Sequence, residues 1–207
     1  MKEITKNILS FQEKDFFFAL RDKIDYAKLL MHSTRNLLID FDTNEAETDG
    51  SRMKLIVGKM SRLFFYKEKK HFSISFPFNI TLDEHDILQI TSYTGKIVDN
   101  KSISEVITIL DNDQFKLNPS PIDFFMEADG VESSGLSLLE EIFQAEPGYI
   151  RYDHDPDRLN GKLHPLHHLD INYSSYGTYK LGLNNPIVES FFENIVNITT
   201  DCSFLSD

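Results

Sequence analysis

The stretch YIRYDHDPDRLNGKLHPLHHLDINYSSYGTYKLGL, residues 149–183, decides the fold expected for the chain. It contains three segments with strand character, Tyr149–His154, Leu166–Tyr173 and Thr178–Leu183. The runs between them hold Pro, Gly, Asn and Ser, which favour turns. The first of these runs is too short for a crossover helix, so the first two segments should pair antiparallel. The sequence therefore predicts a small antiparallel sheet in the C-terminal third.

Most of the remaining chain is predicted to be helical. Apolar residues recur at helical spacing over residues 2–42 and over Arg52–Tyr66. Capping-box patterns, which mark helix starts, begin at Thr81, Ser102 and Ser137. Alternating Phe and Ile predict a strand over His71–Phe78 that could join the sheet.

The fold class expected from these patterns is α+β in a single domain, residues 1–207. A helical portion, 1–146, precedes a His-rich sheet portion, 147–207. The sheet portion should end in a C-terminal helix that opens at Asn184-Asn185-Pro186, because Pro suits the first turn of a helix.

Composition restricts the classes of partner and the location. The net charge of −12 argues against sequence-blind nucleic-acid binding, which needs a basic face. This charge does not exclude a local basic pocket that binds nucleic acid. An acidic chain can also dock on a basic partner. The single cysteine, Cys202, cannot form an intramolecular disulfide, and no signal peptide or membrane-spanning run is seen. We therefore expect a cytoplasmic protein that does not enter a membrane.

Polar residues in the opening stretch form the candidate site. Strand periodicity places His168 and Asp170 on one face and His167 with Leu169 on the other. The first strand ends at His154 and the second is preceded by His164, so hairpin pairing should bring them together. This polar face should open to solvent or a cleft, because burying an unpaired carboxylate is costly. The candidate catalytic residues are His154, His164, His168, Asp170, Arg151, Tyr152 and Asp153.

Two chemistries fit these residues. Imidazole and carboxylate groups could bind a divalent metal such as zinc, as in a metal-dependent hydrolase. Alternatively, histidines could serve as general acid and base in a metal-free ribonuclease, with Arg151 or Arg158 stabilising the phosphate charge. A purely structural role, in which the polar groups support the hairpin, is the third interpretation and is favoured for His167.

The segments Arg151-Tyr-Asp-His-Asp-Pro156 and His164-Pro-Leu-His-His-Leu-Asp170 carry a resemblance to a known family. They resemble the R-Y-D-x-x-P and His-rich segments of small bacterial toxins of the TumE type, and those of a related bacterial family of about this chain's length. Asp170 stands where the toxin pattern often has His. The resemblance covers about twenty residues and implies a toxin–antitoxin or phage-defence setting. It points to Arg151, Tyr152, Asp153, Pro156, His164, His167 and His168.

The leading functional hypothesis is a bacterial toxin or phage-defence effector that cleaves RNA or another phosphodiester. The first alternative is a non-enzymatic protein that binds a partner, an antitoxin or another product of the same operon. The second alternative is a metal-dependent hydrolase.

Overall fold

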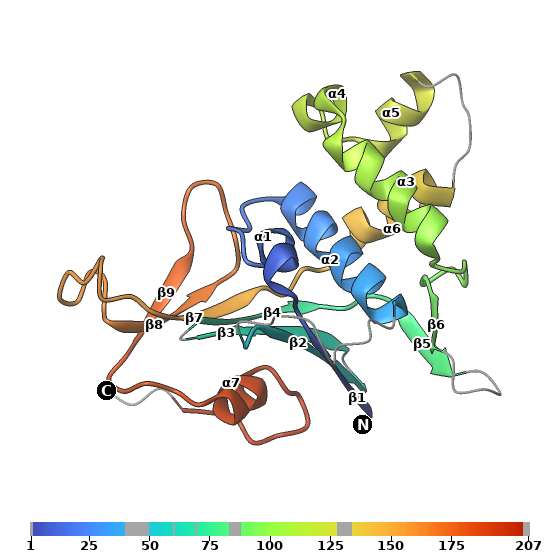
Figure 1. The fold of residues 1–207 in the computed structure, drawn as a ribbon. Coiled ribbons are helices and arrows are strands. Elements are labelled where there is room, and N and C mark those ends of the chain that lie inside the picture. The colour runs from blue at the N-terminus through green and yellow to red at the C-terminus, as the bar shows by residue number, and fades with distance from the viewer. Residues whose placement is uncertain are drawn as a thin grey trace. The chain divides into compact units, whose positions relative to one another are not determined.

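The computed structural model describes residues 2–39, 50–59, 61–68, 70–82, 88–127 and 134–204. The chain divides into two compact units, whose elements are labelled in Figure 1. Unit 1 comprises Met1–Ile8, Asp49–Ser75 and Gly148–Asp207, and unit 2 comprises Leu9–Thr48 and Phe76–Pro147. In sequence, unit 2 is therefore two insertions into unit 1.

Unit 1 is built on a seven-stranded sheet in which every neighbouring pair is antiparallel, in the order β1-β2-β3-β4-β7-β8-β9. The predicted α+β class and the antiparallel pairing of β7 with β8 are confirmed. The strand predicted around His71 also joins the sheet, as the neighbour of β7. The strands are β1 (Lys2–Asn7), β2 (Arg52–Val57), β3 (Arg62–Lys67), β4 (Lys70–Ser75), β7 (Ile150–His154), β8 (His167–Ile171) and β9 (Tyr179–Leu183).

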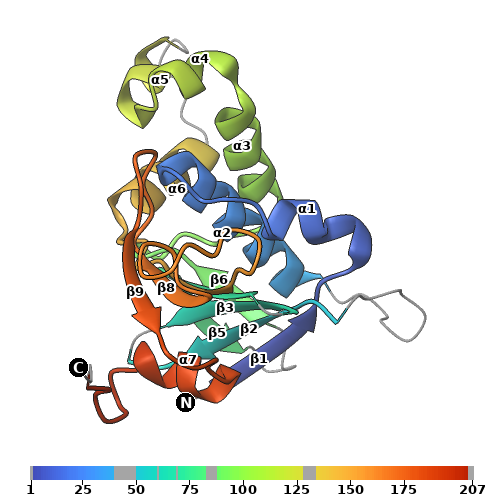
Figure 2. The ribbon, with the colours of Figure 1, turned by 90° about the vertical axis from the view of Figure 1, so that its left-hand side faces the viewer.

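The predicted C-terminal helix is present as α7, Glu189–Ile195, but it starts after the expected opening at Asn184-Asn185-Pro186, with Val188 as its N-cap. It lies against one face of the sheet in both ribbon views (Figures 1 and 2). Phe192 is fully buried there and meets the ring of Phe64 edge-on, with centroids 6.2 Å apart. The core on this face consists of Phe64, Tyr66, Ile150, Tyr152, Leu169 and Phe192. Burial of these aromatic and aliphatic side chains holds α7 to the sheet.

The prediction of helix over Arg52–Tyr66 is wrong, as is the start of the helix predicted over 2–42. Strands β1, β2 and β3 occupy these positions, so the sheet is larger than predicted and draws on both ends of the chain. In β2, Met53 and Leu55 are fully buried while Lys54 between them is not, which is the period of a strand. Cross-strand packing against β1 and β3 overrode the apparent helical spacing.

Unit 2 contains most of the helices. Two short helices precede the long helix α2. Helix α3 packs closely against α6: a Cβ added to Gly135 would lie only 2.3 Å from the Cβ of Glu105, so this position of α6 requires glycine. Among the described residues, no helix is long and apolar enough to cross a membrane. The helices are η1 (Ser10–Gln12), α1 (Glu13–Phe16), α2 (Lys23–Leu38), α3 (Asn100–Asp111), α4 (Asp113–Leu117), α5 (Pro121–Glu127) and α6 (Ser134–Gln144).

Three further predictions in unit 2 are corrected. The helix expected to start at Ser137 is α6, whose described residues begin earlier, at Ser134. The helix expected from Thr81 is replaced by the hairpin of β5 (Asn79–Leu82) and β6 (Leu88–Thr91), and residues 83–87 lie outside the described part of the chain. The helix expected to start at Ser102 begins earlier, with Asp99 as its N-cap. Ser102 is instead the reciprocal member of the capping box: Asp99 Oδ1 accepts from its backbone N–H at 2.8 Å, and its Oγ accepts from the Asp99 N–H at 3.0 Å.

We expect Asp99→Ala to lower the free energy of unfolding by about 1 kcal/mol, because it removes the acceptor for an N-terminal helix donor. The hydrogen bond from the Ser102 backbone N–H lowers the pKa of Asp99. The stabilisation by this cap is therefore fully present above about pH 3.9, the pKa of an aspartate in the unfolded chain. It is lost as the pH falls through the lower pKa that Asp99 has in the folded chain. Urea denaturation at pH 7 and at pH 3 measures it, with Asn100→Ala as the control. Equal losses at both pH values would contradict this assignment.

Candidate functional site

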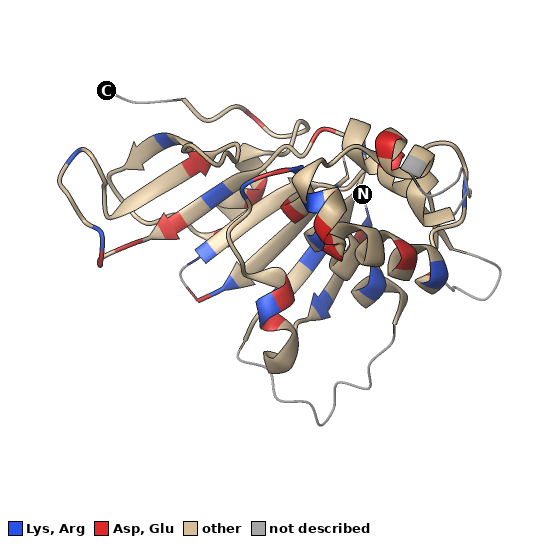
Figure 3. Ribbon diagram, turned by 90° about the horizontal axis from the view of Figure 1, so that it is seen from above, with Lys and Arg blue, Asp and Glu red and all other residues tan. Residues whose placement is uncertain are grey.

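Strand periodicity divides β7 and β8 between two faces of the sheet. Tyr152 and Leu169 face the core beneath α7. Arg151 and Asp153 alternate with Tyr152 along β7, so they lie on the opposite face together with His168 and Asp170 of β8. The predicted separation of His168 and Asp170 from Leu169 and its neighbour His167 is therefore confirmed. Acidic and basic segments lie beside one another on neighbouring strands of the sheet (Figure 3).

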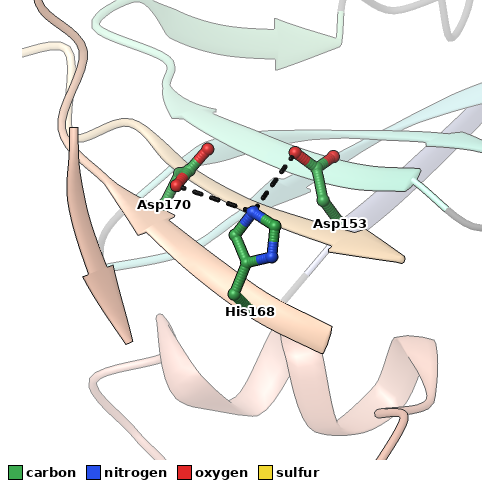
Figure 4. Close-up of side chains that lie close together, drawn as sticks. All are labelled: Asp153, His168 and Asp170. Carbon is green, nitrogen blue, oxygen red and sulfur yellow. Dashed lines mark ion pairs between the residues drawn. The ribbon is translucent and has the colours of Figure 1, made fainter. Parts of the chain in front are cut away.

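Asp153, His168 and Asp170 converge on one another across β7 and β8 (Figure 4). The Nε2 atom of His168 lies 3.9 Å from Asp153 Oδ2 and 3.9 Å from Asp170 Oδ1. Its other ring nitrogen, Nδ1, lies 3.0 Å from the carbonyl oxygen of Pro165. The ring is therefore held at one edge by the loop before β8 and presents its other edge to two carboxylates.

Arg151 links the two carboxylates. Its Nε lies 2.7 Å from Asp153 Oδ2, and its Nη2 donates a hydrogen bond to Asp170 Oδ2. The Nε–H does not point along the line to Asp153, so that contact is an ion pair without a hydrogen bond. Burial by itself would lower the pKa of Arg151, but Tyr149 and the two carboxylates outweigh burial and raise it. Burial of the Tyr149 hydroxyl raises its pKa to about 12.

The prediction that this polar face opens to solvent is wrong for its centre. His168 is 0% exposed, Asp170 1% and Asp153 8%. Within unit 1, the loop between β7 and β8 covers them, since Pro165 contacts His168 and the His164 ring lies 4.7 Å from the His168 ring. The carboxylates tolerate burial because Arg151 neutralises part of their charge.

The site brings together only part of the predicted set. His164 joins His168, but the ring of His154 lies against His167, 4.9 Å between centroids, on the side of the sheet that faces α7. Tyr152 is on that side too, and its hydroxyl lies 2.9 Å from Nδ1 of His167. The expected convergence of His154 with His164 and His168 is therefore wrong: the hairpin pairs as predicted, but alternation along β7 turns the His154 side chain to the other face. His154 nevertheless contributes to the lining of the neighbouring pocket at the end of β7.

A pocket of ≈ 410 Å³ borders the buried cluster within unit 1. Its lining includes three basic side chains, from Lys70, Arg151 and Arg158. Lys70 pairs with Asp153 across β4 and β7. Burial, followed by the charge of Arg151, lowers the pKa of Lys70. The full lining is Glu68, Lys70, Arg151, Asp153, His154, Asp155, Pro156 and Arg158.

Lys70 is the site residue that reasoning from the sequence missed. It ends the basic run Lys67–Lys70, which is typical of a solvated helix end. The signal that could have found it is its position directly before the alternating strand HFSISF, because such a strand extends to Lys70 and carries it into the sheet.

Comparisons of the chain with models of protein families, with curated proteins and with solved structures find no match. The function therefore has to be argued from the geometry of this site.

Proposed function

We propose that the pocket binds the phosphate of a phosphodiester and that the protein is a bacterial effector that cleaves RNA or a related phosphodiester. The observation that supports this most is the gathering of Lys70, Arg151 and Arg158 around one pocket of a chain whose net charge is −12. Lysine and arginine side chains are the usual ligands of phosphate oxygens. The pocket also borders Asp153, which connects it to the buried cluster.

Each group has a role in this proposal. Arg158, whose side chain is 73% exposed, and Lys70 bind the phosphate oxygens. Arg151 stabilises the negative charge that develops on the phosphorus-bound oxygens. Lowering the pKa of Lys70 makes its ammonium a stronger acid, which suits it to protonate a departing oxygen. His168, which is fully buried, positions Asp153 and does not meet substrate.

The reaction proposed for RNA is an internal transesterification. The 2′-oxygen bonds to phosphorus as the bond from phosphorus to the 5′-oxygen breaks. The proton of the 2′-hydroxyl passes to Asp153, and Lys70 in its ammonium form protonates the departing 5′-oxygen. The products are a 2′,3′-cyclic phosphate and a 5′-hydroxyl, so no external reactant is consumed.

The setting proposed is a toxin–antitoxin or phage-defence operon in the bacterial cytoplasm, with an antitoxin or operon neighbour as a protein partner. The resemblance of residues 151–170 to TumE-type toxins supports this setting.

The test compares Lys70→Gln with Lys162→Gln, an exposed lysine in the loop before β8 that does not line the pocket. We expect wild type and Lys162→Gln to arrest growth on expression and to cleave single-stranded RNA when purified. Lys70→Gln should reduce the cleavage rate by 10²-fold or more, the usual size of a general acid–base contribution. Arrest and cleavage that are equal in both variants would remove the pocket from the proposal.

The alternative is a non-enzymatic protein that binds a partner. Two features favour it: the net charge of −12, and the exposure of large apolar side chains on α5, where Ile122 is 64% and Met126 70% exposed. Co-purification of a basic protein encoded nearby, with no RNA cleavage by either component, would favour this function over the first.

A further inference from the structure

We propose that Asp153, His168 and Asp170 form a binding site for one divalent first-row transition metal ion. This inference rests on the contacts of the three side chains and does not depend on the proposed reaction. The three residues each offer one ligand atom, and these atoms all lie within 4.8 Å of one another.

The hydrogen bond of His168 sets the ring in the form that binds a metal. A carbonyl oxygen can only accept, so the Nδ1 atom of His168, 3.0 Å from the Pro165 oxygen, carries the proton. In the neutral ring Nε2 is then an electron-pair donor, and it points at the two carboxylates. Histidines that bind metals in proteins almost always donate their other N–H to a carbonyl or carboxylate in this way.

Among the described residues, two polar atoms inside the cluster have no hydrogen-bond partner. They are His168 Nε2 and Asp170 Oδ1, which lie 3.9 Å apart and belong to residues that are 0% and 1% exposed. Leaving a buried polar atom without a partner costs about 1–3 kcal/mol. Both atoms are electron-pair donors, so neither can satisfy the other. A cation between them satisfies both.

The spacing fits a metal after a small contraction. Bonds of about 2.0–2.2 Å to nitrogen and oxygen place the ligand atoms of a tetrahedral ion roughly 3.4 Å apart. The observed separations of 3.9 Å from His168 Nε2 to Asp153 and to Asp170 exceed this by about 0.5 Å. All three ligand atoms lie within 4.8 Å of one another, so the two carboxylates must approach by at most about 1.4 Å, which side-chain rotation can supply.

Arg151 supports the site. It contacts Oδ2 of Asp170, which leaves Oδ1 directed toward His168. Its Nε lies 2.7 Å from Asp153 Oδ2, the oxygen that is 3.9 Å from His168 Nε2, so Asp153 shares this oxygen between Arg151 and the ion or turns its other oxygen to the ion. Two carboxylates and one guanidinium sum to a net charge of −1, and the ammonium of Lys180 is 3.9 Å from Asp170 Oδ1 on a side chain that is 35% exposed. With Lys180 included the charges sum to zero, so the cation is attracted by the directed lone pairs of His168 Nε2 and Asp170 Oδ1 and not by a net negative charge. The imidazole of the cluster favours Zn²⁺, Co²⁺, Fe²⁺ or Ni²⁺ over Mg²⁺ and Ca²⁺.

The experiment uses the full chain, freed of metal by a chelator, and titrates it with Co²⁺ and with Zn²⁺. We expect one Co²⁺ per chain, with visible absorption bands of a nitrogen- and oxygen-bound ion that Zn²⁺ removes. His168→Gln should weaken Zn²⁺ binding by at least 10²-fold, measured by calorimetry. His167→Gln, the same change on the neighbouring residue and the other face, should alter it by less than threefold.

Absence of one-to-one binding in the folded wild type would overturn the inference, as would equal binding by His168→Gln and wild type. Because His168 is buried, circular dichroism must show that its variant is folded, and Asp170→Asn provides a second test with the same expected loss. RNA cleavage by a chain that binds no metal would overturn this inference alone. Metal binding without cleavage of any phosphodiester would overturn the proposed function alone.

Discussion

Arg151→Met should lower the free energy of unfolding by roughly 3–5 kcal/mol, the usual cost of removing one partner from a buried ion pair. The substitution keeps a side chain of similar length but removes the cation between Asp153 and Asp170, which are 8% and 1% exposed. Two carboxylates would then remain buried without their main partner. Urea denaturation of the purified variant at pH 7 measures the loss.

Arg158→Met is the matched control. Arg158 also pairs with an aspartate, Asp155 at 2.8 Å, but its side chain is 73% exposed, so we expect a loss of at most about 1 kcal/mol. Combining Arg151→Met with Asp153→Asn and Asp170→Asn should recover part of the lost stability, because the unpaired charges are removed as well. A loss for Arg151→Met no larger than that for Arg158→Met would show that the buried network is not formed.

Phe192→Ala should cost roughly 3–5 kcal/mol, the range measured for removal of a large core side chain. Phe192 is 0% exposed and is the fully buried residue of α7 in the sheet core, with ring centroids 6.2 Å from those of Phe64 and His71. The truncation removes this apolar burial and leaves a cavity between α7 and the sheet. The melting temperature and the urea midpoint should both fall.

Phe191→Ala provides the control one residue away on the same helix. Phe191 is 41% exposed, so its truncation removes less buried area and leaves no enclosed cavity. We expect a loss of less than about 1 kcal/mol, within the range of ordinary surface substitutions. Similar losses for the two variants would contradict the packing of α7 described for unit 1.

Local patterns in the C-terminal third predicted its structure well. Three strand segments separated by Pro, Gly and Asn became β7, β8 and β9, and Pro186 preceded the helix α7. The three strands are consecutive in sequence and each pairs with the next, so the pairing follows from local information.

The first 75 residues were harder to predict, because β1 pairs with the distant β2 and because the apolar spacing of β2 and β3 also suits a helix. Over Arg52–Tyr66 the apolar residues fit a helix and a pair of strands equally well when only spacing is considered. The information that separates them is Gly58, which falls between β2 and β3, together with the aromatic run of β3. The assignment of β1 needed the knowledge that β2 is its partner.

Strand alternation predicted part of the candidate site. Alternation placed His168 with Asp170 and separated His167 from them, as observed. The position of His154 was predicted wrongly. The prediction considered only that His154 lies at the same end of the hairpin as His164, and not that its side chain projects from the opposite face of β7. Lys70 was missed because the run Lys67–Lys70 was interpreted as a solvated helix end, although its position directly before HFSISF extends that strand to Lys70. Its place in the pocket also depends on the pairing of β4 with β7.

The most direct test of the proposed site is the rate of cleavage of end-labelled single-stranded RNA by wild type, His168→Gln and His167→Gln at pH 7. The two variants carry the same substitution at adjacent positions on opposite faces of β8. The proposal predicts a loss of at least 10²-fold for His168→Gln and a rate within twofold of wild type for His167→Gln. Equal rates for the two variants, or a larger loss for His167→Gln, would contradict it.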